Sequence, residues 1–159
     1  MVARIAILIL TILFLAVCLV PHHAMAQVDT LAVIGNTGKP GSQGHRVQLT
    51  LMNIQEIAGL QLTLETSHEF LAIDSVRTTP RSSGMMPHWN RVNGKIILID
   101  FNATHAIDTG YGPVLEVFYS VSADASPGMV PLKMKDVVLS DPAGKAVPVV
   151  SVGGTFTIQ

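Results

Sequence analysis

Short stretches in which apolar and polar side chains alternate recur along this chain, and they limit most tightly how it can fold. Residues 59–65 have leucine at every second position, with Gln61, Thr63 and Glu65 between or after the leucines. Residues 45–52 repeat this alternation. A period of two places successive side chains on opposite faces of a β-strand. Because no stretch shows a convincing helical period, the sequence predicts an all-β chain.

Turn-forming Gly, Pro, Asn and Ser residues separate the expected strands, and the longest irregular stretch is predicted at residues 78–93. About nine short strands divided by turns are typical of a jelly-roll β-sandwich, with a β-barrel as the competing architecture. Residues 95–101 are apolar on both faces, which predicts a central strand. The other strands are expected at residues 31–34, 70–76, 114–121, 130–134, 137–139, 147–152 and 155–158. The core is predicted to contain Leu60, Leu62, Leu64, Leu115, Val117 and Tyr119.

The N-terminus has the pattern of a secretory leader. Arg4 precedes an apolar run over residues 5–20, and Ala24 and Ala26 supply the small residues of a cleavage site. We expect cleavage after Ala26, which leaves one domain of roughly 130 residues (27–159) that is secreted or periplasmic. A membrane anchor and lipidation at Cys18, the only cysteine, are the alternatives. The mature domain would contain no cysteine and would depend on its hydrophobic core.

Charge and motifs exclude several classes of function. The formal net charge is −1 and charges of both signs are scattered, whereas nucleic-acid and anionic-membrane partners call for clustered basic residues. The histidines after the leader show no paired metal-binding spacing. Nucleophile elbows, phosphate-binding glycine loops and an obvious pair of catalytic carboxylates are missing from the sequence. We therefore predict a protein that is not an enzyme and needs neither metal nor cofactor.

Several local patterns, in order, resemble the cohesin family over residues 31–158. Residues 38–41, Gly-Lys-Pro-Gly, precede the alternating strand 45–52, and residues 57–64, Ile-Ala-Gly-Leu-Gln-Leu-Thr-Leu, resemble the strand before the family's "YDP..L" segment. Residues 94–101 resemble its central strand, and residues 112–121 its "G.LF.L.F.V" strand. The resemblance implies a nine-stranded cohesin-like jelly roll. It further implies a non-catalytic module that binds a dockerin-like protein partner in extracellular polysaccharide degradation or cell-surface assembly.

In cohesins the dockerin lies on the outer face of one sheet, and the resemblance assigns that face to the strands at 59–65, 95–101 and 114–121. Alternation then predicts a partner-binding face with apolar anchors, above all Leu98 and Phe118, inside a polar rim. The alternative is that a loop or a terminal strand covers these apolar residues. The predicted face consists of Gln61, Thr63, Glu65, Ile96, Leu98, Asp100, Glu116 and Phe118.

Two features separate this chain from dockerin-binding cohesins. Gly59 and Gln61 stand near positions where the family has Asn and Asp, and Asp100 stands near a position where the family has an apolar residue.

Direct binding of polysaccharide is the alternative function, because aromatic rings stack on sugar faces. The aromatic residues expected in the core are Phe70, Phe101, Tyr119 and Phe156. Trp89 and Tyr111 are therefore the candidate carbohydrate contacts, although no row of aromatic residues is visible, and the alternative for Trp89 is a loop residue packed over the edge of the sandwich.

Overall fold

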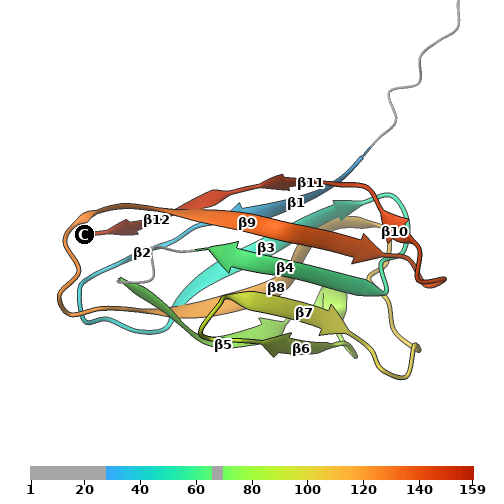
Figure 1. Cartoon of the computed structure of the whole chain (residues 1–159), viewed down its shortest axis with the longest axis horizontal. Coiled ribbons are helices and arrows are strands. Elements are labelled where there is room, and N and C mark those ends of the chain that lie inside the picture. The colour runs from blue at the N-terminus through green and yellow to red at the C-terminus, as the bar shows by residue number, and fades with distance from the viewer. Residues whose placement is uncertain (1–27, 66–69) are drawn as a thin grey trace, which may run out of the picture.

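Two β-sheets packed face to face form the protein, as the computed structural model of residues 28–65 and 70–159 shows (Figure 1). The predicted leader, including Cys18, lies outside the described residues. Helical structure within the described part is limited to one 3₁₀ turn, η1 (Pro80–Ser82). The two separate sheets confirm the sandwich and exclude the barrel.

The first sheet has five strands in the order β11-β1-β3-β8-β5. In chain order these strands are β1 (Asp29–Ile34), β3 (His45–Asn53), β5 (Leu71–Thr78), β8 (Gly110–Val121) and β11 (Val149–Val152). Neighbouring strands are antiparallel except β1 and β11, which run parallel.

The second sheet has seven strands, six of them in the order β2-β12-β9-β4-β7-β6, with β10 paired to β9. In chain order these strands are β2 (Thr37–Gly38), β4 (Gly59–Glu65), β6 (Met86–Trp89), β7 (Lys95–Ile99), β9 (Gly128–Ser140), β10 (Ala146–Val147) and β12 (Gly154–Ile158). The view in Figure 1 faces this sheet, with β9, β4, β7 and β6 following one another from top to bottom.

The core between the sheets contains the side chains that alternation assigned to it. Leu62, Leu115, Val117 and Tyr119 are fully buried, and Leu60 and Leu64 nearly so. Phe101 is the exception among the expected core aromatics, because it follows the end of β7 and is 67% exposed. Its ring instead packs edge-on against His88 of β6, with the ring centroids 5.5 Å apart.

β-Bulges explain where the strand predictions differ from the structure. Residues 130–134 and 137–139 were expected as two strands, but both belong to β9, which contains one extra residue opposite β4. Asp136 at this point has φ 51°, in the left-handed region that a bulge can require. A second bulge in β8 turns Val114 inward beside Leu115. The short strands β2 and β6 were not predicted, and β6 lies within the stretch expected to be irregular.

Candidate binding face

The pairing of β4 with β7 decides which side chains lie on the outer face of the second sheet. Gln61 is opposite Ile97, and Leu62 is opposite Ile96. Directly opposed residues of antiparallel strands share a face. Because Leu62 is a core residue, Ile96 faces the core and Ile97 faces outward with Gln61. The outward orientation predicted for the polar residues of β4 is confirmed by their partial exposure: Gln61, Thr63 and Glu65.

The outward orientation predicted for Ile96 and Leu98 is wrong, because both side chains are fully buried. After Lys95, strand β7 is apolar at every position. Its alternation therefore defines two sets of residues without saying which set faces the core. The register with β4 settles this, and the half-buried residues on the outer face are Ile97 and Ile99.

Asp100 was also placed outward, and this too is wrong. Its side chain is 6% exposed and accepts hydrogen bonds from the backbone N–H groups of Asn102 (3.0 Å), Thr104 (2.8 Å) and His105 (2.9 Å). The Thr104 hydroxyl also donates to it, at 2.9 Å, and His105 Nδ1 lies 3.0 Å away. The Asn102 backbone hydrogen bond and the His105 and Thr104 contacts hold the Asp100 pKa well below its usual range. The carboxylate therefore organises the loop after β7 and contributes nothing to the outer face.

The β8 residues Glu116 and Phe118 face outward as predicted, but on the opposite sheet. β8 pairs with β3 and β5, so its outer face is separated from β4 and β7 by the whole core. Glu116 forms an ion pair with Arg46 at 3.1 Å, and the Arg77 guanidinium lies 4.8 Å from the centre of the Phe118 ring. The predicted set is therefore divided between two faces and the core.

Strand β9 replaces β8 as the third contributor to the outer face of the second sheet. Val138 is opposite Gln61 and is 47% exposed. Together with the two outward isoleucines of β7, it borders a shallow hollow of about 170 Å³ above the middle of the sheet. We call this surface the candidate face and define it by Gln61, Thr63, Ile97, Ile99 and Val138.

Gly59 keeps the hollow open at its floor. A Cβ atom built at this position would lie 2.6 Å from the Ser140 hydroxyl oxygen, closer than real contacts allow. Any larger residue at position 59 would displace the Ser140 side chain and fill part of the hollow. The glycine that departs from the family pattern thus shapes the surface.

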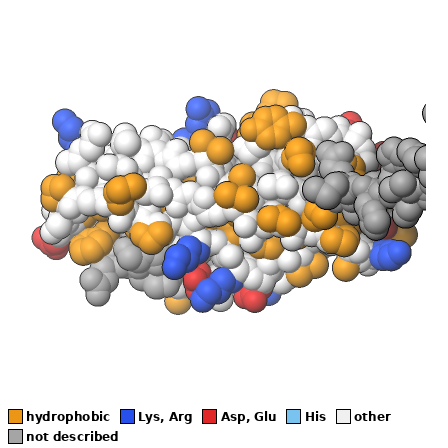
Figure 2. Space-filling view, turned by 90° about the horizontal axis from the view of Figure 1, so that it is seen from above, with side chains coloured by type: hydrophobic (Ala, Val, Ile, Leu, Met, Phe, Trp, Pro, Cys, Tyr) orange, Lys and Arg blue, Asp and Glu red, His pale blue; other side chains and the backbone are white. Residues whose placement is uncertain are grey.

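One end of the candidate face is basic. Lys133 and Lys135 of β9 lie opposite Glu65 and Thr63 of β4, and Lys95 of β7 is opposite Thr63 on the other side. Lys135 Nζ is 2.5 Å from Glu65 Oε1, and this contact raises the Lys135 pKa. Figure 2, seen from above the rim where β9, β11 and β1 lie, shows a cluster of charged side chains of both signs at the lower border, with other charged side chains scattered along the remaining edges.

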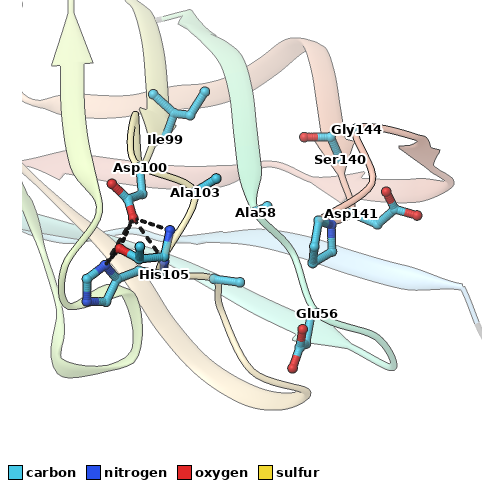
Figure 3. Close-up of a pocket in the computed structure, with 12 residues that line it drawn as sticks. Glu56, Ala58, Ile99, Asp100, Ala103, His105, Ser140, Asp141 and Gly144 are labelled. Carbon is cyan, nitrogen blue, oxygen red and sulfur yellow. Dashed lines mark hydrogen bonds and ion pairs between the residues drawn. The ribbon is translucent and has the colours of Figure 1, made fainter.

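A pocket of about 320 Å³, which we call the end pocket, lies at the other end of the candidate face (Figure 3). It is bounded by the segment before β4, the loop after β7 and the turn after β9. The lining residues are Glu56, Ala58, Ile99, Asp100, Ala103, Thr104, His105, Ala106, Ser140, Asp141, Pro142 and Gly144. It adjoins the hollow above the sheet, since Ile99 and Ser140 line both.

The end pocket contains an aspartate, a histidine and a serine, but they are not arranged as a catalytic triad. Asp100 and His105 lie close together on one side of the pocket, whereas Ser140 lies on the other side (Figure 3). A serine nucleophile needs its base within hydrogen-bond reach. The Asp100–His105 contact therefore serves the loop.

The two proposed carbohydrate contacts are not on one surface. Trp89 ends the edge strand β6 of the second sheet and is 40% exposed, beside a pocket of about 240 Å³ lined also by Asn90, Asn93 and Lys95. Tyr111 lies on β8 of the first sheet and is 75% exposed. They cannot contact one sugar together.

The described residues offer neither a metal-binding cluster nor a membrane-spanning helix. Residues 28–65 and 70–159 contain no group of three or more His, Cys, Asp or Glu side chains that could hold a metal ion. Helices long and apolar enough to cross a membrane do not occur in those two segments.

Comparisons with known proteins identify the fold. No family model matches the sequence, and a search of curated proteins gives no match. Among solved structures, the non-cellulosomal cohesin of the archaeon Archaeoglobus fulgidus superimposes with a TM-score of 0.69 at 18% identity, covering 84% of this chain and 92% of that one. A chain of the Clostridium thermocellum Coh-OlpA–Doc918 complex gives 0.70 at 17%, covering 84% and 100%. CaCohA2 of Clostridium acetobutylicum gives 0.67 at 16%, covering 84% and 92%.

These similarities show that the chain has the cohesin fold. The fold predicted from the order of motifs is thereby confirmed, although the sequence identities are low. Sequence reasoning found the face-forming strands β4 and β7, but it missed the contribution of β9 and the end pocket. One signal in the sequence could have pointed to β9: its residues 133–140 combine lysines with valines, as a face-forming strand can.

Proposed function

We propose that this protein is a non-catalytic binding module that holds a protein partner on the candidate face. The observation that carries the proposal is the partly exposed apolar centre formed by Ile97, Ile99 and Val138 on three neighbouring strands, with charged residues beyond its ends. Apolar anchors surrounded by polar groups are the usual composition of a protein–protein interface. Because backbone hydrogen bonds fix the sheet, docking would need little reordering of the face.

A dockerin-like module is the partner that the comparisons favour. Solved structures that share this fold include cohesins determined in complexes with dockerins from Clostridium thermocellum and Acetivibrio cellulolyticus. The buried position of Asp100 supports the proposal, because its carboxylate does not interrupt the apolar surface. Gly59 and Gln61 still differ from the family pattern, so the partner would make different polar contacts there.

Export completes the proposal. The predicted leader would place the domain outside the cytoplasm, in the periplasm or the extracellular space, where a binding module can join a polysaccharide-degrading or cell-surface assembly. This role depends on the identity of the partner and on cleavage of the leader.

Binding of polysaccharide through Trp89 is the second candidate function. A partly exposed tryptophan beside Asn90 and Asn93 provides a ring for stacking and amide groups for hydrogen bonds. Retention of the purified domain on cellulose, lost in Trp89→Ala and kept in Tyr111→Ala, would support it. No retention of the unchanged domain would exclude cellulose as its ligand.

The test of the protein-binding proposal compares two substitutions of the same kind on opposite sheets. Ile97→Glu puts a charge at the centre of the candidate face, and Val150→Glu puts one on β11, where Val150 is 52% exposed. Each variant and the unchanged domain are immobilised and exposed to the secreted proteins of the host and to purified dockerins. We expect a protein that binds the unchanged domain and Val150→Glu, and whose affinity falls about thirty-fold or more with Ile97→Glu. Equal binding to Ile97→Glu would place the interface elsewhere.

A further inference from the structure

The end pocket continues the candidate face and has room for one long side chain. Its volume of about 320 Å³ is nearly twice that of the hollow above the sheet. Ile99 and Ser140 line both, so a partner that covers the face also covers the mouth of the pocket.

The lining of the pocket combines apolar and polar groups. Ala58, Ile99 and Ala103 supply apolar surface and Ser140 a hydroxyl, whereas the Glu56 and Asp141 carboxylates lie on the outer side and point away from the centre (Figure 3). None of the lining residues is a lysine or an arginine.

The three carboxylates of the pocket differ in how many hydrogen bonds they already accept from the protein. Asp100 is fully engaged by the loop after β7. Asp141 Oδ1 accepts hydrogen bonds from the backbone N–H groups of Ala143 (2.9 Å) and Lys145 (2.8 Å), and Asp141 is partly exposed. Glu56 is exposed. Two carboxylates at the rim thus remain available to a ligand.

We propose that the end pocket takes a lysine or arginine side chain from the docked protein partner; this rests on the proposed function of the candidate face. Long cationic side chains bury their methylene stems against apolar surface and keep the charged head at a polar boundary. The alanines and Ile99 suit a stem that passes through the pocket from the candidate face, and Glu56 and Asp141 suit a head that emerges on the outer side.

The position of the pocket would fix the orientation of the partner. The opposite end of the candidate face carries Lys95, Lys133 and Lys135, of which Lys135 is paired with Glu65. A partner with a basic side chain at one end of its docking surface and carboxylates at the other gains contacts in one orientation and meets like charges in the reverse. The partner is therefore expected to bind in a single orientation.

The pocket can be tested with a small probe, without the partner. The ¹⁵N-labelled domain is titrated with N-acetyl-arginine amide, and N-acetyl-leucine amide serves as the apolar control. We expect the arginine probe to shift the backbone amide signals of residues 56–58, 100–106 and 140–144, with weaker binding as salt rises. Leucine amide should shift them less at the same concentration.

Two double variants make the test specific to the rim. Glu56→Gln with Asp141→Asn removes both charges and keeps an oxygen acceptor at position 141, and should weaken arginine-amide binding roughly five-fold or more. Glu116→Gln with Asp124→Asn removes the same charge elsewhere on the domain and should leave this binding unchanged.

Equal binding of the two probes, unchanged binding to the rim variant, or shifts located elsewhere would each overturn the inference. A result that refutes the pocket proposal can be distinguished from one that refutes the proposed function. Arginine-amide binding does not depend on a partner, whereas partner capture that is sensitive to Ile97→Glu does not depend on the probe.

Discussion

Replacing Ile96 and Ile97 separately by alanine should affect stability very differently, although the two residues are identical and adjacent. Ile96 is fully buried between the sheets, whereas Ile97 is half-buried on the candidate face. Both substitutions remove the same three carbon atoms from the same strand. Any difference in the free energy of unfolding therefore reports the side of the sheet on which each residue lies.

The magnitude follows from burial. Three buried carbons at about 0.8 kcal/mol each give a transfer term of roughly 2.4 kcal/mol, and a cavity in a packed core brings the expected loss for Ile96→Ala to about 3–4 kcal/mol. Ile97→Ala leaves no enclosed cavity, because its side chain borders solvent. Its expected cost is about 1 kcal/mol or less.

Urea unfolding followed by circular dichroism measures both values, and equal m-values would show that the two variants unfold alike. A large loss for Ile97→Ala with a small loss for Ile96→Ala would refute the register of β4 with β7. The outward residues of β7 would then be Ile96 and Leu98, as predicted from the sequence. Similar losses for both variants would mean that a covering segment buries the candidate face.

Three further predictions concern the Tyr119 hydroxyl, the Asp100 carboxylate and the cleavage site of the leader. Tyr119→Phe should leave stability unchanged or raise it by about 1 kcal/mol in the same urea assay. The reason is that the Tyr119 hydroxyl is buried without a hydrogen-bond partner among the described residues, and burial raises its pKa. A clear loss of stability would show that the hydroxyl has a partner. The hydrogen bonds to Asp100 lower its pKa, so their stabilisation should be complete above about pH 4 and lost as the pH falls further. Asp100→Asn should lower stability at neutral pH and weaken this acid dependence, and an unchanged pH profile in urea unfolding would contradict the assignment. N-terminal sequencing of the exported protein should begin at Gln27, and a start at Met1 or Cys18 would disprove the predicted cleavage site.

The strands with one clearly polar face could be predicted from the sequence with little error. Residues 59–65 form β4 with the predicted bounds, and its leucines are buried as expected. The core positions of β3 and most of those in β8 followed in the same way. In these strands the sequence itself distinguishes the inner from the outer side, because polar groups lose hydration when they are buried.

The candidate face could be predicted only in part. Its β4 residues were found, but Ile97 and Ile99 were assigned to the wrong side, since β7 has no polar residue after Lys95 to mark its outer face. The outward orientation of Phe118 was predicted correctly. Local alternation, however, cannot reveal that β8 pairs with β3 and β5 rather than with β4 or β7.

The sequence by itself determined the all-β class, most of the strands and the residues of the core, because side-chain alternation acts within a few neighbouring positions. Only the tertiary structure decided which side of β7 is buried, which sheet contains β8 and that Val138 of β9 completes the face. It also brought residues 56–58, 99–106 and 140–144 together around the end pocket. These features depend on contacts between segments far apart in the chain, and such pairings are set by how the two sheets bury their apolar faces together.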